Sequence, residues 1–280
     1  MTNTIKSILA ESEQSLNAHS DSARIDAELL LGHVLKKDRS FFHTWPEYEL
    51  QPQQLLDFQT LLEQRLNGKP IAHILSQGGF WSLNLKVTSD TLIPRPDTER
   101  LVELALDIIP QDKKWRILDL GTGSGAIALA IASERPLCEI VATDYSAAAL
   151  TVAKENANTH NLNHIQFLKS HWFENIEIQK FDLIVSNPPY ICDNDIHLSQ
   201  GDVRFEPLSA LTAGADGLND IKIIIKQAKS YLNHGSRILI EHGFDQADAV
   251  ITLFKAENYQ QVKNYKDYAG QPRVTTALFS

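Results

Sequence analysis

The stretch that decides the fold of this 280-residue chain ends in a pair of prolines: Phe181-Asp182-Leu183-Ile184-Val185-Ser186-Asn187-Pro188-Pro189-Tyr190. The run from Phe181 to Val185 is apolar except for Asp182, which is typical of a buried strand in a parallel sheet. Proline cannot donate a hydrogen bond to a neighbouring strand, so the strand must end near Asn187. Pro188 also favours an extended conformation at Asn187. The sequence therefore predicts a stiff platform at the carboxyl end of a strand.

The groups on this platform suit the binding of a planar NH2 group. The Asn187 side-chain oxygen can accept one N–H, the carbonyl oxygen of Pro188 can accept the other, and the Tyr190 ring can cover the flat face. With Pro189 these residues form an Asn-Pro-Pro-Tyr sequence, a signature of enzymes that methylate exocyclic or amide nitrogens. The alternative is a proline-rich turn that only ends the strand, and the four residues alone do not decide between the two.

A second junction between a strand and a loop, upstream of the platform, favours a nucleotide-type cofactor. A strand is predicted over residues 115–120, and the loop Gly121-Thr122-Gly123-Ser124-Gly125 follows at once. Glycines between a strand and a helix let a ligand approach the backbone closely. The next predicted strand, residues 139–143, ends in Asp144, about 20 residues beyond the loop, where an acid can bind ribose hydroxyls. The alternative role for Asp144 is to cap the helix that follows.

The spacing of the glycines is Gly-x-Gly-x-Gly, which differs from the Gly-x-Gly-x-x-Gly of dinucleotide-binding folds. With Asp119 just before it, the loop resembles the S-adenosylmethionine loop of class I methyltransferases. Strands and helices alternate along the rest of the chain, which predicts a parallel sheet with helices on both faces. In such sheets ligands bind beyond the carboxyl ends of the strands. The glycine loop and Asn187 should therefore lie together, while Trp172 is expected either against an adenine ring or in the core.

The chain is predicted to have three parts. Residues 1–75 are expected to form a small all-helical domain, because apolar residues recur at helical spacing and Pro52 suits the first turn of a helix. This domain carries no catalytic cluster, so it is either scaffold or a surface for a partner. Residues 76–92 read as a strand or hairpin linker with a turn at Gly78-Gly79, and residues 93–280 as the α/β domain. The long polar segment 191–218 is expected to be a lid or a binding loop.

A proline-rich segment, Ile93-Pro94-Arg95-Pro96, precedes the first helix of the predicted α/β domain. Asp97 or Thr98 is expected to cap that helix, which should run to about Ile109. The segment is either a rigid connection or a wall of the active site that places Arg95 or Glu99 near the substrate.

Composition narrows the classes of partner. The net charge of −9 disfavours binding of the chain to a nucleic-acid backbone, and no apolar run approaches membrane-spanning length. Cys138 and Cys192 provide neither a disulfide framework nor metal-ligand spacing. The first 16 residues read as an amphipathic helix and not as a signal peptide. We therefore expect a cytoplasmic protein with no metal, no direct nucleic-acid partner and no membrane partner.

Taken together, these motifs identify a resemblance to the bacterial release-factor glutamine methyltransferases, the HemK/PrmC group, over essentially the whole chain. The segments that carry it are the glycine loop, the Asn-Pro-Pro-Tyr corner, residues 93–99, Val203-Arg204-Phe205-Glu206-Pro207, residues 213–218, Glu241-His242-Gly243 and residues 269–274. The resemblance implies a seven-stranded class I methyltransferase domain behind a hairpin and a helical domain. It also implies S-adenosylmethionine as cofactor, and as substrate the glutamine in the Gly-Gly-Gln loop of peptide chain release factors.

Carried over by position, the resemblance implies contacts of the cofactor with the loop from Gly121 to Gly125, Asp144, Trp172 and Asn187. It implies contacts of the substrate with Asn187, Pro188, Pro189 and Tyr190, with Asn187, Pro188 and Tyr190 taking part in catalysis. Many members place an acid before the tryptophan to meet the adenine amino group, and here His171 stands there. We therefore expect a different adenine contact at that point.

The predicted chemistry needs positioning more than a strong base. An amide nitrogen is a poor nucleophile because its lone pair is delocalised into the carbonyl group. Two acceptors, Asn187 and the Pro188 carbonyl, would fix the NH2 group in line with the methyl donor, and such positioning supplies roughly 7–11 kcal/mol. One alternative is a DNA or RNA amino-group methyltransferase, which the acidic charge disfavours. The other is a non-catalytic module that senses the cofactor while the helical domain recruits a partner.

Overall fold

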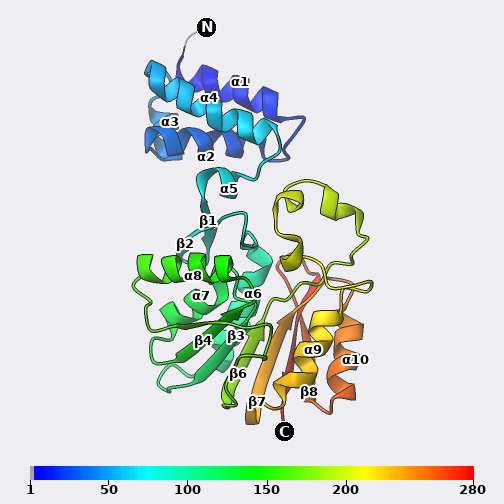
Figure 1. Ribbon diagram of the computed structural model, residues 1–280. Helices are drawn as coiled ribbons and strands as arrows, with labels where there is room; N and C mark the ends of the chain where they lie inside the picture. Colours follow the sequence, from blue (N-terminus) through cyan, green and yellow to red (C-terminus); the bar gives the residue numbers. More distant parts are fainter. Residues whose placement is uncertain (1–2) are drawn as a thin grey trace. The chain divides into compact units, whose positions relative to one another are not determined.

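The computed structural model describes residues 3–280, and the chain divides into two compact units (Figure 1). One unit consists of the residues up to Gln77 together with Ser199–Phe205, and the other of Gly78–Leu198 and Glu206–Ser280. Met1 and Thr2, which the predicted helical domain includes, lie outside the described residues. The segment predicted to be a lid is therefore shared, because its middle belongs to the first unit and its two ends to the second.

The first unit is helical, which confirms the prediction for this part of the chain. Its helices are α1 (Ile5–Leu16), α2 (Ala23–Leu35), α3 (Arg39–Thr44), α4 (Pro52–Leu66) and α5 (Ile71–Leu75). The Thr4 hydroxyl caps α1 by accepting a hydrogen bond from the Ser7 amide, and Pro52 occupies the first turn of α4. Apolar side chains at helical spacing, among them Leu9, Leu31 and Phe58, form the buried core of this unit.

The second unit is built on a seven-stranded sheet, as the class I methyltransferase fold requires. Its strands lie in the order β5-β4-β3-β6-β7-β9-β8. All neighbours up to β7 are parallel, and β9 is antiparallel to both β7 and β8. The strands are β3 (Arg116–Leu120), β4 (Glu139–Asp144), β5 (Gln166–Lys169), β6 (Phe181–Ser186), β7 (Leu232–Glu241), β8 (Gln260–Lys266) and β9 (Pro272–Leu278).

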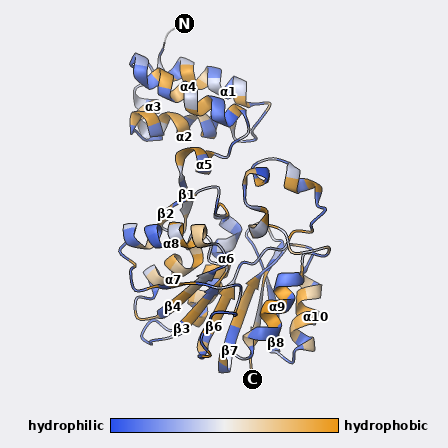
Figure 2. Ribbon diagram, in the orientation of Figure 1, coloured by the Kyte–Doolittle hydropathy of each residue, from blue (hydrophilic) through white to orange (hydrophobic). Residues whose placement is uncertain are grey.

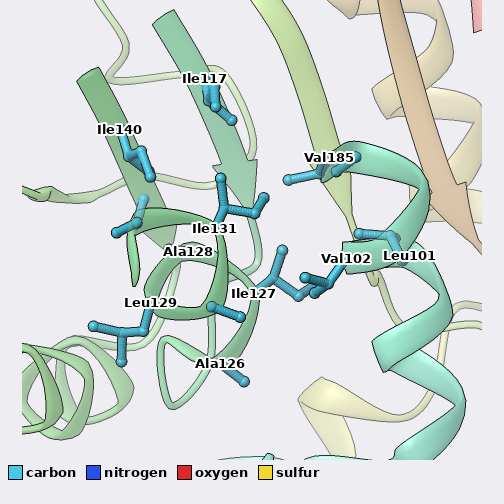
Figure 3. Close-up of a cluster of buried hydrophobic side chains, with 14 of the residues drawn as sticks. Leu101, Val102, Ile117, Ala126, Ile127, Ala128, Leu129, Ile131, Ile140 and Val185 are labelled. Carbon is cyan, nitrogen blue, oxygen red and sulfur yellow. The ribbon is translucent and has the colours of Figure 1, made fainter. Parts of the chain in front are cut away.

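Helices cover both faces of this sheet. They are α6 (Pro96–Ile108), α7 (Ala126–Glu134), α8 (Ala147–Thr159), α9 (Asn219–Ala228) and α10 (Ala247–Ala256). The central strands are hydrophobic along most of their length (Figure 2), because successive side chains point to opposite faces and both faces are buried. Val185 packs in the core beneath α6 and α7 (Figure 3), whereas Ile184 packs in the core formed with α9 and α10.

Two details before β3 differ from the prediction. Gly78 and Gly79 lie within strand β1 (Gln77–Phe80) and form no turn, since the chain turns at Trp81 before β2 (Leu83–Lys86). The Trp81 amide donates to Glu99 at 2.8 Å, and this contact holds the turn. Helix α6 begins at Pro96 with Arg95 at its cap position, so Asp97 and Thr98 both lie inside its first turn and neither caps it.

The long segment between β6 and α9 contains three short 3₁₀ turns, Ile196–Ser199, Val203–Phe205 and Leu208–Ala210. Strand β7 begins at Leu232 and not at Arg237, because Leu232 already pairs with Phe181 on β6, ahead of an irregularity in the register before Arg237. No helix within residues 3–280 is long and apolar enough to cross a membrane.

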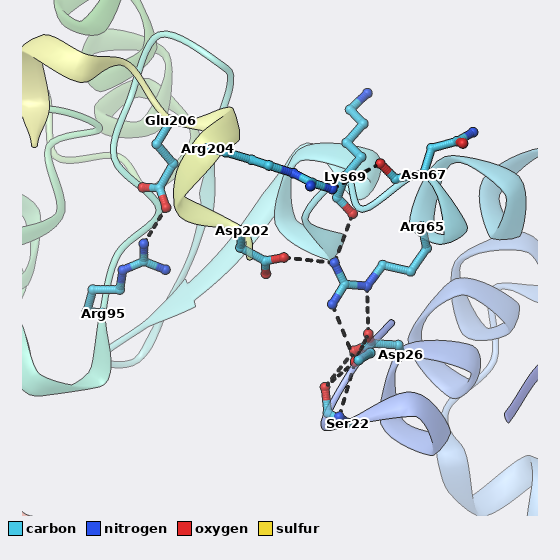
Figure 4. Close-up of polar contacts among 10 residues, drawn as sticks. Ser22, Asp26, Arg65, Asn67, Lys69, Arg95, Asp202, Arg204 and Glu206 are labelled. Carbon is cyan, nitrogen blue, oxygen red and sulfur yellow. Dashed lines mark hydrogen bonds and ion pairs between the residues drawn. The ribbon is translucent and has the colours of Figure 1, made fainter. Parts of the chain in front are cut away.

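A buried ion pair fixes the returning segment Ser199–Phe205 within the helical unit (Figure 4). Arg65 donates to Asp26 at 2.7 Å, and both side chains are almost fully buried. Ser20 and Ser22 also donate to the Asp26 carboxylate. The second arm of the guanidinium reaches Asp202 at 2.8 Å, and Asp202 is half-exposed.

This arrangement predicts unequal effects of two substitutions. Arg65→Ala leaves the Asp26 carboxylate buried without its cation, which costs about 3–5 kcal/mol of stability. Asp202→Ala removes a half-exposed partner and costs about 1 kcal/mol or less. Hydrogen exchange of the amides in α2 and α4 measures the loss in this unit. Equal protection in the two variants would contradict the central role of the buried pair.

Candidate active site

The two junctions singled out in the sequence lie side by side at the carboxyl edge of the sheet. Strands β3 and β6 are parallel neighbours with Leu120 opposite Ser186, so the loops that follow them begin at the same level. A methyl group added at Gly121 would lie 4.0 Å from the Asn187 carbonyl oxygen. The glycine loop and the Asn-Pro-Pro corner therefore meet, as the sequence predicts.

A cavity of about 790 Å³ opens at this edge, a size typical of ligand sites. Eight of the predicted site residues line it: Gly121, Thr122, Gly123, Ser124, Asp144, Trp172, Asn187 and Pro189. Three others lie behind its surface. Gly125 begins α7 and packs against Leu129 and Ala153, while Pro188 and Tyr190 lie deeper in the corner and are at least partly buried.

The glycine loop adopts a backbone that other residues rarely adopt. Gly121 and Gly123 have φ values of 72° and 56°, in the left-handed region that favours glycine. The Gly123 amide donates to Asp144 at 2.9 Å. An added methyl group on Gly123 would meet no atom within 4 Å among the described residues, so the backbone there is open to a ligand.

Asp144 is half-buried at the end of β4 and has acceptor capacity to spare. One of its carboxylate oxygens accepts from the Gly123 amide and the other from the Ser146 amide at 2.8 Å. Burial raises the pKa of Asp144 above its ordinary value. Helix α8 is capped by the Ser146 hydroxyl, so Asp144 is not its capping residue. The two oxygens, each already oriented by one N–H, can still accept from two adjacent hydroxyl groups.

Trp172 forms one wall of the cavity, and its edge is fixed by an acid that sequence reasoning missed. Its ring would lie 3.5 Å from a methyl group added at Gly121, and its Nε1 donates to Asp220 at 3.0 Å. Asp220 also lines the cavity, and burial raises its pKa. No local pattern marks this acid, because it lies in the first turn of α9. His171, which stands where the family often has an acid, pairs with Glu174 at the exposed rim.

The Asn187 carboxamide is held from behind. Its Nδ2 donates to the Thr98 hydroxyl at 3.1 Å, and Thr98 is buried in the first turn of α6. The Tyr190 hydroxyl lies 3.5 Å from Glu241, and burial raises the pKa of Tyr190, which keeps the phenol neutral. The Tyr190 carbonyl accepts from Gln246 at 2.9 Å. The corner is therefore rigid in its backbone and in its side chains.

The proline-rich segment before α6 is indeed a wall of the cavity. Arg95 lines it and forms an ion pair with the buried Glu206 (Figure 4). Glu206 also accepts from the Ile93 amide at 3.0 Å, so it fixes the segment Pro207–Thr212, several residues of which line the cavity. Glu99, the other residue expected near the substrate, instead accepts from Trp81 in the hairpin.

The electrostatics of the cavity suit a cationic ligand. Asp119, behind the glycine loop, is fully buried, and burial raises its pKa to about 7. Its Oδ2 accepts from Thr122 at 2.6 Å, but its Oδ1 has no hydrogen-bond partner within residues 3–280. A positive charge in the cavity would favour the ionised forms of Asp119 and Asp144. A sulfonium nucleoside with an ammonium group meets this requirement and supplies ribose hydroxyls for Asp144. The described part of the chain contains no cluster of acids, histidines and cysteines able to hold a metal ion.

A sheet of this strand order, with a glycine loop after β3, an acid at the end of β4 and an Asn-Pro-Pro-Tyr corner after β6, defines a class I methyltransferase that uses S-adenosylmethionine.

Comparison with known proteins agrees with this class and narrows it. Residues 100–202 match the methyltransferase small domain family, and residues 7–75 match the PrmC N-terminal domain. The release factor glutamine methyltransferase of Aliivibrio fischeri is 50% identical over 98% of this chain and 97% of its own length. That of Escherichia coli K12 is 48% identical over 97% of both chains. A solved methyltransferase from Pyrococcus furiosus, 18% identical, shares the fold with a TM-score of 0.54 over 79% of this chain and 98% of its own.

The chain belongs to the release factor glutamine methyltransferase family, since relatives of this identity cover nearly its whole length.

The arrangement around Asp144 predicts a specific loss of cofactor affinity. Asp144→Ala removes a charged acceptor for ribose hydroxyls, and hydrogen bonds to charged groups contribute about 1.5–3 kcal/mol. Affinity for S-adenosylmethionine should fall about tenfold or more, as measured by calorimetric titration. Ser146→Ala, which removes only the cap of α8, serves as the control for local unfolding. Unchanged affinity in Asp144→Ala would exclude a ribose contact.

Proposed function

We propose that this chain transfers a methyl group from S-adenosylmethionine to the side-chain amide nitrogen, N5, of the glutamine in the Gly-Gly-Gln motif of peptide chain release factors. It thereby supports translation termination. The observation that carries the proposal is the Asn187 carboxamide at the wall of the cofactor cavity, with its nitrogen already bonded to Thr98. Relatives that bear the same activity in their names match over almost the full chain.

The residues proposed to hold the cofactor lie around one cavity. The backbone from Gly121 to Gly125 approaches the ligand, Asp144 accepts from the ribose hydroxyls, and the Trp172 ring covers the adenine. Asn187 lies where the cofactor and the substrate meet. When bound, S-adenosylmethionine supplies an electrophilic methyl group on a positively charged sulfur. The fit is supported by the open backbone at Gly123 and by the buried acids that favour a cation.

The residues proposed to hold the substrate act on its NH2 group. Asn187 Oδ1 and the Pro188 carbonyl oxygen each accept one N–H, while Pro189 and Tyr190 shape the slot. Both acceptors draw electron density toward the nitrogen and orient its lone pair at the methyl group. The cofactor, held by the glycine loop and Asp144, would supply the methyl group as an electrophile, and the nitrogen held by Asn187 and the Pro188 carbonyl would accept it. The proton leaves the nitrogen for water. Positioning of this kind supplies roughly 7–11 kcal/mol of the barrier.

The helical unit is proposed to recognise the folded release factor, because none of its described residues lines the cavity. Binding of the factor at a distance from the reacting amide raises kcat when the binding energy is gained only in the transition state. The proposed substrate acts on ribosomes, so the reaction is assigned to the cytoplasm. The net charge of −9 gives no support to a nucleic-acid acceptor.

The substrate and the role of Asn187 are tested together. Purified release factor incubated with the chain and S-adenosylmethionine should gain one methyl group per molecule by intact-mass measurement, located by fragmentation on the Gly-Gly-Gln glutamine. Asn187→Ala should lower kcat about a hundredfold, since misplacement of a reacting group costs a factor of that order, while cofactor affinity should fall far less. DNA and RNA serve as alternative acceptors in parallel. Methylation of a nucleic acid in place of the factor would refute the proposed function.

The role of the helical unit predicts a difference between two substrates. A short peptide containing Gly-Gly-Gln lacks the remote surface of the folded factor, so its kcat/KM should be much lower than that of the intact protein. The same peptide with Gly-Gly-Asn is the control for glutamine-specific transfer. If peptide and intact factor react with equal efficiency, the helical unit does not recognise the substrate.

A further inference from the structure

The side chain of Gln246 joins three parts of the sheet unit that lie far apart in the sequence. It stands at the start of α10, and only 8% of its surface is exposed. Its Nε2 donates to the Tyr190 carbonyl oxygen at 2.9 Å and lies 3.3 and 3.4 Å from the carbonyl oxygens of Asp216 and Gly217. Its Oε1 accepts from the Gly243 amide, just beyond β7, at 2.9 Å. The contact with Tyr190 connects this side chain to the corner proposed to hold the substrate.

Hydrogen-bonding chemistry fixes how the Gln246 carboxamide is turned. The Gly243 amide only donates, so the atom that it meets must be the oxygen Oε1. The NH2 group then faces the three carbonyl oxygens, which only accept. A carboxamide combines two donors with an acceptor in one plane. Neither a carboxylate nor an apolar side chain can therefore make the same set of bonds.

The two prolines of the corner make this anchor important. Pro188 and Pro189 carry no N–H and cannot donate a backbone hydrogen bond, so the corner depends on the residues at its two ends. On one side, β6 is paired with β3 and β7 up to Ser186. On the other side, the first carbonyl beyond the prolines, that of Tyr190, is held by Gln246. The Pro188 carbonyl proposed to accept an N–H of the substrate lies between these two anchors.

Gly217 lets its segment of chain lie directly against the corner. Its φ is 66°, and a methyl group added there would lie 2.2 Å from the Tyr190 carbonyl oxygen and 2.8 Å from Gln246 Nε2. Only glycine allows so close an approach. Gln246, Tyr190 and Gly217 therefore pack so tightly that a change at one of them displaces the others.

The stretch of chain that Gln246 ties to the corner also reaches the cavity. Ile191 and Thr212 form an isolated parallel bridge. In this bridge the Ile191 amide donates to the Leu211 carbonyl at 2.9 Å, and the Ala213 amide donates to the Ile191 carbonyl at 3.0 Å. Thr212 lines the cavity. The position of the chain beyond the prolines therefore affects the wall of the cavity as well as the corner.

We propose that Gln246 is a positioning residue of the transfer reaction, which holds the Asn-Pro-Pro-Tyr corner and the adjoining cavity wall where the substrate amide needs them. It acts through the Tyr190 carbonyl and touches no reacting atom. The inference rests on the proposed function for its substrate. The bonds of Gln246 are a property of this chain alone and can be measured without any substrate.

The first test measures kcat with intact release factor and saturating S-adenosylmethionine. Gln246→Met keeps the length of the side chain but removes its donors and its acceptor. The kcat should fall roughly ten- to a hundredfold, as expected when a distant change misplaces a reacting group. Affinity for S-adenosylmethionine should change little, because Gln246 is not among the residues that line the cavity. A kcat equal to that of the unaltered chain would overturn the proposal.

Gln246→Glu separates the donated hydrogen bond from packing. Its carboxylate still accepts from Gly243 but offers no donor to Tyr190, so kcat should be reduced at neutral pH. Burial among carbonyl oxygens favours the protonated acid, which regains an O–H donor as pH falls. Relative to the unaltered chain, the kcat of Gln246→Glu should therefore rise toward acid pH, whereas that of Gln246→Met should stay constant. A Gln246→Glu ratio that does not depend on pH would overturn the role of the donor.

Two glycines of the same segment provide a matched pair of variants. Gly217 and Gly214 have φ values of 66° and 82°, so alanine is strained at both positions. The methyl group of Gly217→Ala presses on the Tyr190 carbonyl, whereas that of Gly214→Ala meets the side chain of Asn219, which can turn away. The kcat should fall about as far in Gly217→Ala as in Gln246→Met, and much less in Gly214→Ala. Equal losses in the two glycine variants would mean that strain alone lowers kcat, and the proposal would fail.

A measurement without substrate separates this inference from the proposed function. Hydrogen exchange of the free chain should be about fivefold faster at the Ile191 and Ala213 amides in Gln246→Met, because loss of a buried hydrogen bond weakens local structure by that order. The amides of β3 and β4 should keep their protection. If the chain methylates no release factor but exchange rises only at the first two amides, the proposed function fails and the anchoring by Gln246 stands. If exchange at these amides is unchanged, the anchoring fails whatever the substrate.

Discussion

The site depends on one constraint, the parallel register of β3 and β6. With Leu120 opposite Ser186, both strands end at the same level, and each is followed by a residue that cannot continue it in the usual way. Gly121 turns into the left-handed region, and Asn187 is held extended by the proline that follows. A slip of one residue would reverse the faces of a whole strand, separate the two loops and bury Asn187 against the wrong helices. The cores on both faces of the sheet therefore fix the geometry of the cavity.

Several acidic side chains at this edge of the sheet are buried. Asp119, Asp144 and Glu241 all have their pKa raised by burial. In each case the ionised form is less stable in the folded chain than in water, so each costs stability as pH rises through its raised pKa. Such a cost is typical of functional sites, where charge is kept for a ligand or for orientation and not for folding. Asp26, one of the buried acids of the helical unit, differs because it has a full ionic partner in Arg65.

The segment between β6 and α9 is anchored at two positions only a few residues apart, one in each unit. Asp202 bonds Arg65 and belongs to the helical unit, whereas Glu206 bonds Arg95 and the Ile93 amide and belongs to the sheet unit. One continuous piece of chain therefore contains both residues that line the cavity and residues that pack with the helices. A segment of 32 residues (187–218) without a long helix or strand is uncommon unless it has a function. Its two anchors indicate that the segment is structured and is not a loose connection.

Site residues could be predicted from the sequence where their role depends on adjacent residues in the chain. They could not be predicted where the role depends on contacts between distant elements. The glycine loop, the acid after β4 and the Asn-Pro-Pro corner follow from local rules about glycine, proline and strand ends, and the alternation of strands and helices then brings them together. Thr98 read as a helix cap, because nothing near it in the sequence points to Asn187. Its hydrogen bond to the Asn187 carboxamide follows only from the docking of α6 on the sheet, which is set by packing across the whole sheet. Asp220 was missed for the same reason, since its partner Trp172 lies in a different loop. A local pattern can therefore predict which groups touch the ligand, but the groups that hold those residues in place come from the fold.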